Sequence, residues 1–90
     1  MDVDVELPAV LAHLAGSAHL RLSVEDDATL ADVVDALAPV VGRRLRDENG
    51  TLRRYVNVYV DGEDARTLGG LASPVRSGAR VLVVPSIAGG

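Results

Sequence analysis

The chain has 90 residues, no cysteine and a formal net charge of −4. A chain of this length makes one domain with a single modest core. The lack of cysteine excludes a disulfide framework, a thiol nucleophile and a thiolate metal site.

The acidic balance and the low aromatic content argue against nucleic-acid binding. Residues 1–40 carry eight acidic residues and one arginine, whereas residues 41–90 carry five acidic residues and eight arginines. Phosphate contacts dominate duplex binding, so an acidic chain is a poor candidate. Two aromatic residues, Tyr55 and Tyr59, are too few for a base-stacking platform. The arginines of the second half could instead attract a protein partner with acidic patches.

Nothing in the sequence predicts a membrane or export segment. No apolar run approaches the roughly 18 residues that span a bilayer. The N-terminus Met1–Asp4 alternates apolar and acidic residues, which does not suit a secretory signal. We therefore expect a cytoplasmic protein without membrane contact, and a monomer that binds its partners transiently.

The first elements predicted are two strands. Val3, Val5 and Leu7 alternate with acidic residues and predict a half-buried strand that ends at Pro8. Residues 9–16 form a connection that includes a helical turn. The alternation over residues 20–24 predicts a second strand, antiparallel to the first.

A short helix follows the acidic loop at residues 25–27. Thr29 fits an N-cap, because Asp32 lies three residues later, where its carboxylate can reach the free backbone amide. Apolar residues at positions 30, 33, 34 and 37 form one buried stripe. Pro39 predicts that this helix is short. A second helical turn is predicted from Gly42 to Glu48.

The second half predicts three more strands. Residues 56–60 alternate most regularly, and Asp61-Gly62 predicts a tight turn into a short strand that carries Ala65. Gly69-Gly70 predicts a turn with positive φ, after which Leu71 enters the core. Residues 81–84 are apolar on both faces, which predicts a central strand.

This order of elements predicts an α+β fold of the β-grasp type. We expect a mixed sheet of four to five strands with one main helix packed across it. The predicted domain covers residues 1–85, and residues 86–90 are expected to form a flexible C-terminal tail that leaves the end of a central strand.

The final dipeptide, Gly89-Gly90, suggests that the C-terminal carboxylate is the working group. Glycine has no side chain, so two glycines can thread a narrow cleft and bring the carboxyl carbon to a nucleophile. An enzyme could activate the carboxylate of Gly90 as an acyl phosphate or adenylate and pass it to sulfur or nitrogen.

Four stretches of the chain carry a resemblance to a known family. They are Leu7-Pro8-Ala9-Val10-Leu11, the segment from Arg54 to Asp64, Gly69-Gly70-Leu71-Ala72, and Val84-Pro85-Ser86-Ile87-Ala88-Gly89-Gly90. The chain resembles the MoaD/ThiS family of ubiquitin-like sulfur carrier proteins. Within that family it is most similar to the CysO-like carriers of cysteine biosynthesis.

The resemblance implies a protein co-substrate of enzymes, with no cofactor of its own. An E1-like adenylating enzyme would use ATP and magnesium to adenylate Gly90, and a sulfur donor would convert the adenylate to a thiocarboxylate. The acceptor would be a PLP-dependent cysteine synthase or a thiosugar synthase. In the cysteine branch a metalloprotease would release the product.

The same resemblance assigns roles to the tail. Gly90 would carry the adenylate and the sulfur, while Gly89 and Ala88 would give access to active sites. Val84 and Ile87 are candidates for partner contact, with ordinary packing as the alternative reading.

Three other functions stay open at this point. A ubiquitin-like modifier would share the fold and tail but form an isopeptide with a lysine. A carrier of the molybdopterin or thiamine type would differ in its acceptor, although aliphatic residues replace several aromatic positions of the molybdopterin-type carriers. A plain β-grasp binding module would not use its tail.

A stand-alone enzyme is the weakest reading. His13 and His19 are expected to be exposed polar residues, with no cysteine beside them. Asp61, Glu63 and Asp64 fit a hairpin turn better than a cation site, because an EF-hand loop needs a longer, fixed spacing. We expect no catalytic residue and no metal ligand.

Overall fold

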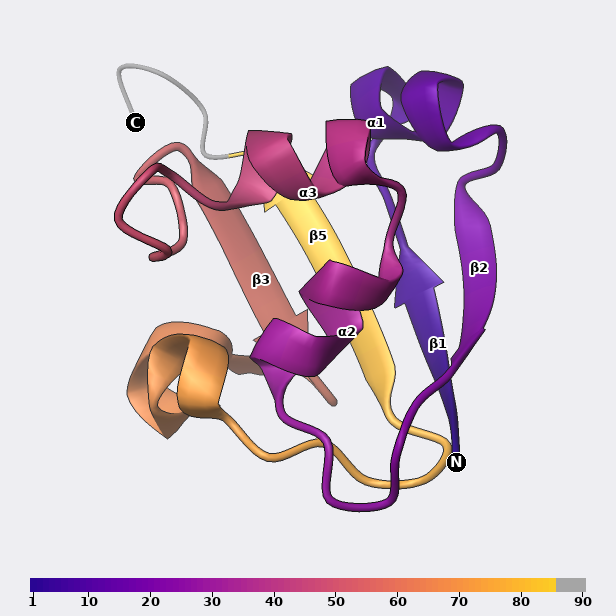
Figure 1. Cartoon of the computed structure of the whole chain (residues 1–90), viewed down its shortest axis with the longest axis vertical. Helices are drawn as coiled ribbons and strands as arrows, with labels where there is room; N and C mark the ends of the chain where they lie inside the picture. The colour runs from indigo at the N-terminus through magenta and orange to yellow at the C-terminus, as the bar shows by residue number, and fades with distance from the viewer. Residues whose placement is uncertain (86–90) are drawn as a thin grey trace.

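Short alternating segments form one five-stranded mixed sheet. The computed structural model describes residues 1–85. The strands are β1 (Asp2–Glu6), β2 (His19–Ser23), β3 (Val56–Val60), β4 (Glu63–Asp64) and β5 (Arg80–Pro85). Their order is β2-β1-β5-β3-β4 (Figure 1). The β1–β5 pair is parallel and the other pairs are antiparallel, which confirms the predicted β-grasp sheet.

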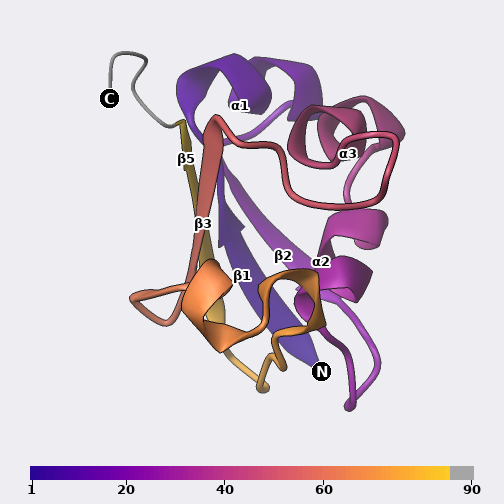
Figure 2. The same cartoon turned by 90° about the vertical axis from the view of Figure 1, so that its left-hand side faces the viewer.

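Helices cover one face of this sheet. They are α1 (Ala9–Ala15), α2 (Leu30–Ala36) and α3 (Pro39–Leu45), and two 3₁₀ turns follow β4, namely η1 (Ala65–Leu68) and η2 (Gly70–Ala72). Figures 1 and 2 show α2 and α3 lying over the same side of the sheet. Within residues 1–85, every helix is too short or too polar to cross a lipid bilayer.

The predicted cap of α2 is confirmed. The Asp32 carboxylate accepts a hydrogen bond of 2.8 Å from the backbone N–H of Thr29. This bond satisfies one of the amides that a helix start leaves without a partner.

Two predicted elements are wrong in position. The second helical segment is α3 from Pro39 to Leu45, not a turn from Gly42 to Glu48. Proline suits the first turn of a helix, because its missing N–H would have no partner there. Pro39 therefore begins a new helix as well as limiting α2. Ala65 lies in η1 and not in a strand, because the Asp64 carboxylate accepts from the backbone N–H of Arg66 at 2.9 Å and caps the turn.

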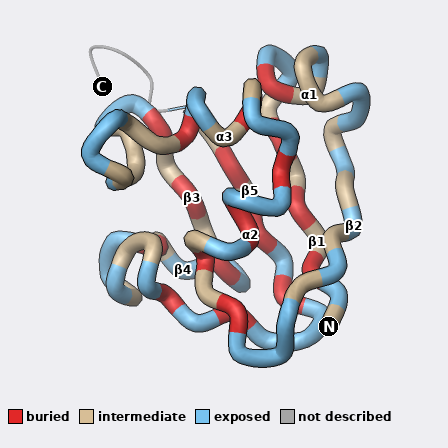
Figure 3. The backbone as a smooth tube through the Cα atoms, viewed as in Figure 1, coloured by how far each residue is buried: buried red, intermediate tan, exposed pale blue. Residues whose placement is uncertain are grey.

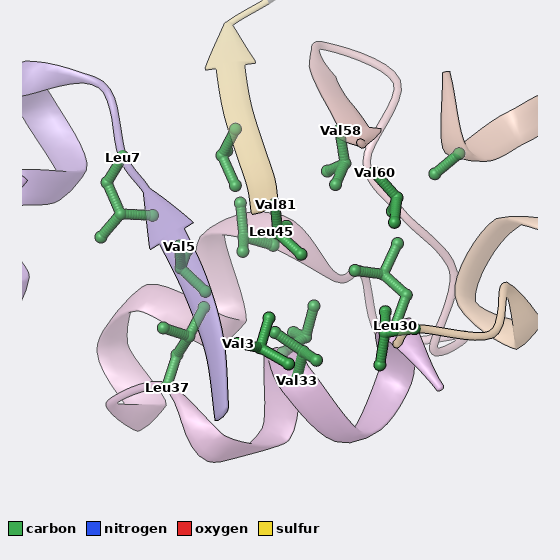
Figure 4. Packing of buried hydrophobic residues seen from close by; sticks show 14 of the residues in the cluster. Val3, Val5, Leu7, Leu30, Val33, Leu37, Leu45, Val58, Val60 and Val81 are labelled. Carbon is green, nitrogen blue, oxygen red and sulfur yellow. The ribbon is translucent and has the colours of Figure 1, made fainter. Parts of the chain in front are cut away.

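The core fills the space between the sheet and the helices. Figure 3 shows buried positions along the strands of the sheet and in α2 and α3. The close view in Figure 4 shows aliphatic side chains from both layers meeting there, with Leu30 and Leu45 fully buried. Leu71 is partly buried against this cluster, in line with its predicted place.

The central strand is β5, as predicted, but only one of its faces is fully buried. Val81 and Val83 are buried, whereas Leu82 and Val84 are partly exposed. The side chains alternate across the strand, and the helices lie over one side only (Figure 2). Pairing with β1 and β3, rather than burial of both faces, makes β5 central.

The turn at Gly69-Gly70 has the predicted backbone. The φ angles are +110° at Gly69 and +63° at Gly70. Residues with a side chain rarely adopt these angles, so glycine is required by conformation here.

Candidate functional site

The candidate site begins where β5 ends. The pairing of β5 with β1 extends only to Leu82, which lies opposite Glu6. From Val83 to Pro85 the strand pairs with β3 alone, and Asn57 lies opposite Val84. The chain therefore leaves the sheet beside the first residues of β3, which form one wall of the tail's root.

Arg66 braces this wall. Its guanidinium donates to the side-chain oxygen of Asn57 at 2.8 Å and to the backbone carbonyls of Val56 at 2.7 Å and Arg53 at 3.3 Å. Hydrogen bonds from a charged donor are the stronger ones in proteins. The residue was missed in the sequence analysis, because no local pattern links an arginine of η1 to the start of β3.

The structure covers only part of the predicted site. Val84 is partly exposed at the end of β5, so its side chain is available for contact. Ile87, Ala88, Gly89 and Gly90 lie outside the described residues. Their predicted roles, and the division of the chain at residue 85, stay predictions.

An apolar hollow lies directly at the root of the tail. Its volume is about 100 Å³, and its walls come from α1, α3, the start of β3 and the end of β5. Its lining includes Val10, Leu11, Arg44, Tyr55, Val83 and Pro85. Sequence reasoning missed this surface, because Val10 and Tyr55 are brought together only by the fold.

The two histidines and the acidic residues around β4 do not line this hollow. His13 and His19 are exposed, as predicted. The Nδ1 atom of His19 lies 3.5 Å from a carboxylate oxygen of Glu6, a neighbour on β1 that was not anticipated.

The acidic residues around β4 have structural partners. The Asp61 carboxylate accepts from the backbone N–H of Arg80 at 2.9 Å, and Asp64 caps η1. Across residues 1–85, no three histidine or acidic side chains gather in a group that could hold a metal ion.

Asp47 braces the connection between α3 and β3. Its carboxylate accepts from the hydroxyl of Thr51 at 2.9 Å and from the backbone N–H groups of Thr51 at 3.1 Å and Asn49 at 2.9 Å. These bonds, the Thr51 hydroxyl first, lower the pKa of Asp47 below its usual 3.8. The ionised carboxylate therefore helps to hold the loop that leads to Arg53, whose carbonyl Arg66 binds.

Comparison with known proteins gives full-length matches. The chain is 34% identical to the sulfur carrier protein CysO of Mycobacterium tuberculosis, with 100% of both chains covered. The crystal structure of that protein superposes with a TM-score of 0.82, covering 94% of this chain and 99% of the other.

Two further matches are a modifier protein and a solved complex. Small archaeal modifier protein 3 of Haloferax volcanii is 31% identical over 100% of both chains. A crystal structure of an Amycolatopsis orientalis BexX/CysO complex matches with a TM-score of 0.78 and 32% identity, covering 98% of this chain and 99% of the matched chain.

A family profile also matches the chain. The ThiS family profile matches residues 5–90, which is nearly the whole chain. The TM-scores of the two solved relatives show that they share this fold. The chain therefore belongs to the ThiS family of ubiquitin-like sulfur carrier and modifier proteins.

Proposed function

We propose that this chain is a sulfur carrier whose C-terminal Gly90 receives and delivers the sulfur atom. The observation that carries the proposal is the full-length match, at 34% identity, to a sulfur carrier protein. The geometry of the root supports it, because β5 is paired on both sides up to Leu82 and with β3 from there to Pro85, so the tail follows a strand that is fixed in the sheet.

The proposed chemistry has two steps at one carbon. The Gly90 carboxylate attacks the α-phosphorus of ATP, forming an acyl adenylate and releasing pyrophosphate. A sulfide donor attacks the carboxyl carbon and AMP leaves, which gives the thiocarboxylate directly. A persulfide donor also displaces AMP but gives an acyl disulfide, and a second thiol must then attack the donor's sulfur and break the S–S bond to release the thiocarboxylate. Adenylation is needed because a carboxylate is a poor electrophile with a poor leaving group. An E1-like enzyme with ATP and magnesium would supply this activation.

The body contributes rigidity and access rather than catalysis. The bonds from Arg66 to Asn57 and Val56 fix the start of β3 to η1, and the start of β3 in turn pairs with the end of β5. The terminal glycines Gly89 and Gly90 and the small Ala88 would let the tail enter a narrow active site. Val84 and Ile87 would contact the partner near the root.

The acceptor we favour is an enzyme of cysteine or thiosugar biosynthesis. The similarity to CysO supports a PLP-dependent cysteine synthase with an accompanying metalloprotease. The matched BexX/CysO complex supports the broader point that a carrier with this fold binds a separate protein. The carrier would present its thiocarboxylate as a nucleophile, so that free sulfide is avoided.

A second candidate function is protein modification. The 31% identity to small archaeal modifier protein 3 over both full lengths favours it. Carrier and modifier share the acyl adenylate and differ only in the nucleophile, sulfur in one case and a lysine amine in the other.

Pyrophosphate exchange with the E1-like enzyme of the source organism tests the shared step. The wild-type chain should support exchange between ATP and labelled pyrophosphate. A variant that lacks Gly90 should keep the native fold by circular dichroism and lose exchange. Equal exchange by the two proteins would overturn the proposed role of Gly90.

A further inference from the structure

The hollow at the tail's root carries an inference about the partner. Val10 is 64% exposed and Tyr55 is 57% exposed, and within residues 1–85 they are the exposed large hydrophobic side chains. Single apolar residues scattered over a surface are ordinary. Here both residues border the same hollow, although one lies in α1 and the other precedes β3. Such a paired exposure around an apolar floor is typical of a protein interface.

The floor of the hollow is part of the core. Val83 and Leu11 are 2% and 6% exposed. Their side chains are fixed by the packing of β5 and α1, so the hollow has a defined shape before anything binds. A preformed hollow limits the ordering cost of association.

The length of the tail keeps the activating enzyme close to this surface. Five residues follow Pro85, and an extended chain spans at most about 3.5 Å per residue, or about 17 Å in all. An enzyme that holds the carboxyl group of Gly90 must therefore lie within that distance of Pro85. Pro85 itself lines the hollow, so the hollow is among the surfaces that lie within this reach.

The charge at the rim of the hollow indicates which kind of side chain the enzyme would place there. Arg44 is exposed and lines the hollow, and its neighbour Arg43 is also exposed. Among residues 1–85, the side chains that line the hollow include no acidic one. A carboxylate on the partner would therefore meet a complementary charge here.

We infer that the hollow between Val10 and Tyr55 receives an apolar side chain of the enzyme that adenylates Gly90, with an enzyme carboxylate facing Arg44. This inference rests on the proposed function, and it names the docking surface that brings the tail to the enzyme. The docking contact is made before and after adenylation alike, so it sets the affinity for the carrier and not the rate of the chemical step.

Two matched pairs of variants test this docking surface. Val10→Asp places a charge in the hollow, and Ala72→Asp makes a similar change at an exposed position of η2. Tyr55→Ala removes one wall, and Tyr59→Ala removes the other tyrosine, which lies on the opposite face of β3 from Val58 and Val60. Thermal unfolding monitored by circular dichroism verifies that each variant is folded. Pyrophosphate exchange with the purified E1-like enzyme then gives KM and kcat for each chain.

Val10→Asp and Tyr55→Ala should each raise KM on the order of tenfold at unchanged kcat, as expected for an interface hot spot. Ala72→Asp and Tyr59→Ala should match the wild type. Arg44→Ala should raise KM less and weaken its dependence on salt. In nuclear magnetic resonance spectra, the amide signals of Val10, Leu11 and Tyr55 should lose intensity when the enzyme is added.

Other results would overturn the inference. Unchanged KM for Val10→Asp and Tyr55→Ala, with normal exchange by the wild type, would reject the docking surface and leave the proposed function standing. A loss confined to Tyr59→Ala would place the interface on the open face of the sheet.

If deleting residues 86–90 shifts the Val10 and Tyr55 signals in the free chain, the hollow holds the chain's own tail. If the free chain forms a dimer and Val10→Asp dissociates it, the hollow is occupied by a second copy of the chain. Failure of the wild type to support exchange would reject both proposals.

Discussion

Arg66 donates a hydrogen bond of 2.8 Å to the side chain of Asn57, nine residues earlier in the chain. Asn57 in turn lies opposite Val84 in the β3–β5 pair. The guanidinium thus reaches from a 3₁₀ turn to the strand that holds the root of the tail. The Arg66–Asn57 hydrogen bond therefore connects η1 to the strand end from which the carboxylate would be delivered.

Replacing Arg66 with alanine should loosen the root without unfolding the domain. The change removes hydrogen bonds from a charged donor, each contributing about 1.5–3 kcal/mol when charged. We expect amide exchange at Val56, Asn57 and Val84 to accelerate by at least about tenfold, equivalent to ~1.4 kcal/mol. Arg76→Ala, in the exposed turn before β5, is the control. Exchange rates that match those of the control would show that the Arg66 bonds do not hold the strand end.

Replacing Gly69 and Gly42 with alanine should change the stability of the fold in opposite directions. Gly69 has a φ of +110°, so Gly69→Ala should destabilise the fold by about 1–2 kcal/mol even though its Cβ would have room. Gly42 lies within α3, where a Cβ would meet the Val34 carbonyl oxygen at an ordinary 3.7 Å. Gly42→Ala should therefore stabilise by about 0.5–1 kcal/mol. Urea unfolding measures both, and a shift of the same sign in both variants would contradict the backbone assignment.

The Leu45 side chain should dominate the packing of α3. It is fully buried, and truncation to alanine leaves a cavity that typically destabilises by about 2–5 kcal/mol. Leu52→Ala is a matched control, because Leu52 only packs against the edge of the core and is partly exposed. Equal destabilisation of the two variants would mean that α3 is not seated on the sheet as described.

Acid should weaken the loop that Asp47 braces. A carboxyl group with a lowered folded-state pKa contributes stability that is complete above its unfolded pKa, here 3.8, and is lost as pH falls through the folded value. Thr51→Val removes the largest cause of the lowering, so the pKa of Asp47 should rise toward 3.8. A carboxyl titration by nuclear magnetic resonance checks this. Val40→Ala, on the preceding helix, is a control that should leave the titration unchanged.

Much of the fold could be predicted because its signals are local. The alternation around Val58 and the spacing of Thr29 and Asp32 each report a strand or a helix start directly. The position of α3 was wrong because proline can limit one helix and begin the next, and only packing decides between the two. The partly exposed face of β5 was missed because an apolar run does not say whether both faces are covered.

The candidate site was predictable only in part, because only some of its residues form a local pattern in the sequence. The two terminal glycines are adjacent in the sequence, so the sequence alone points to Gly90. The hollow depends on Val10 and Tyr55, which lie 45 positions apart and meet only through the β-grasp topology. Arg66 likewise has no local partner that would signal its contact with Asn57.

The intact mass of the chain tests the central proposal most directly. The chain should be produced together with the E1-like enzyme and sulfur donor of its own organism, and its mass compared with that of a variant lacking Gly90 made in the same way. Replacement of one carboxyl oxygen by sulfur should raise the wild-type mass by about 16 Da and leave the variant unchanged. An unshifted wild-type mass, or a shift that the variant shares, would contradict the proposal that Gly90 carries sulfur, and conjugates of much higher mass would favour the modifier instead.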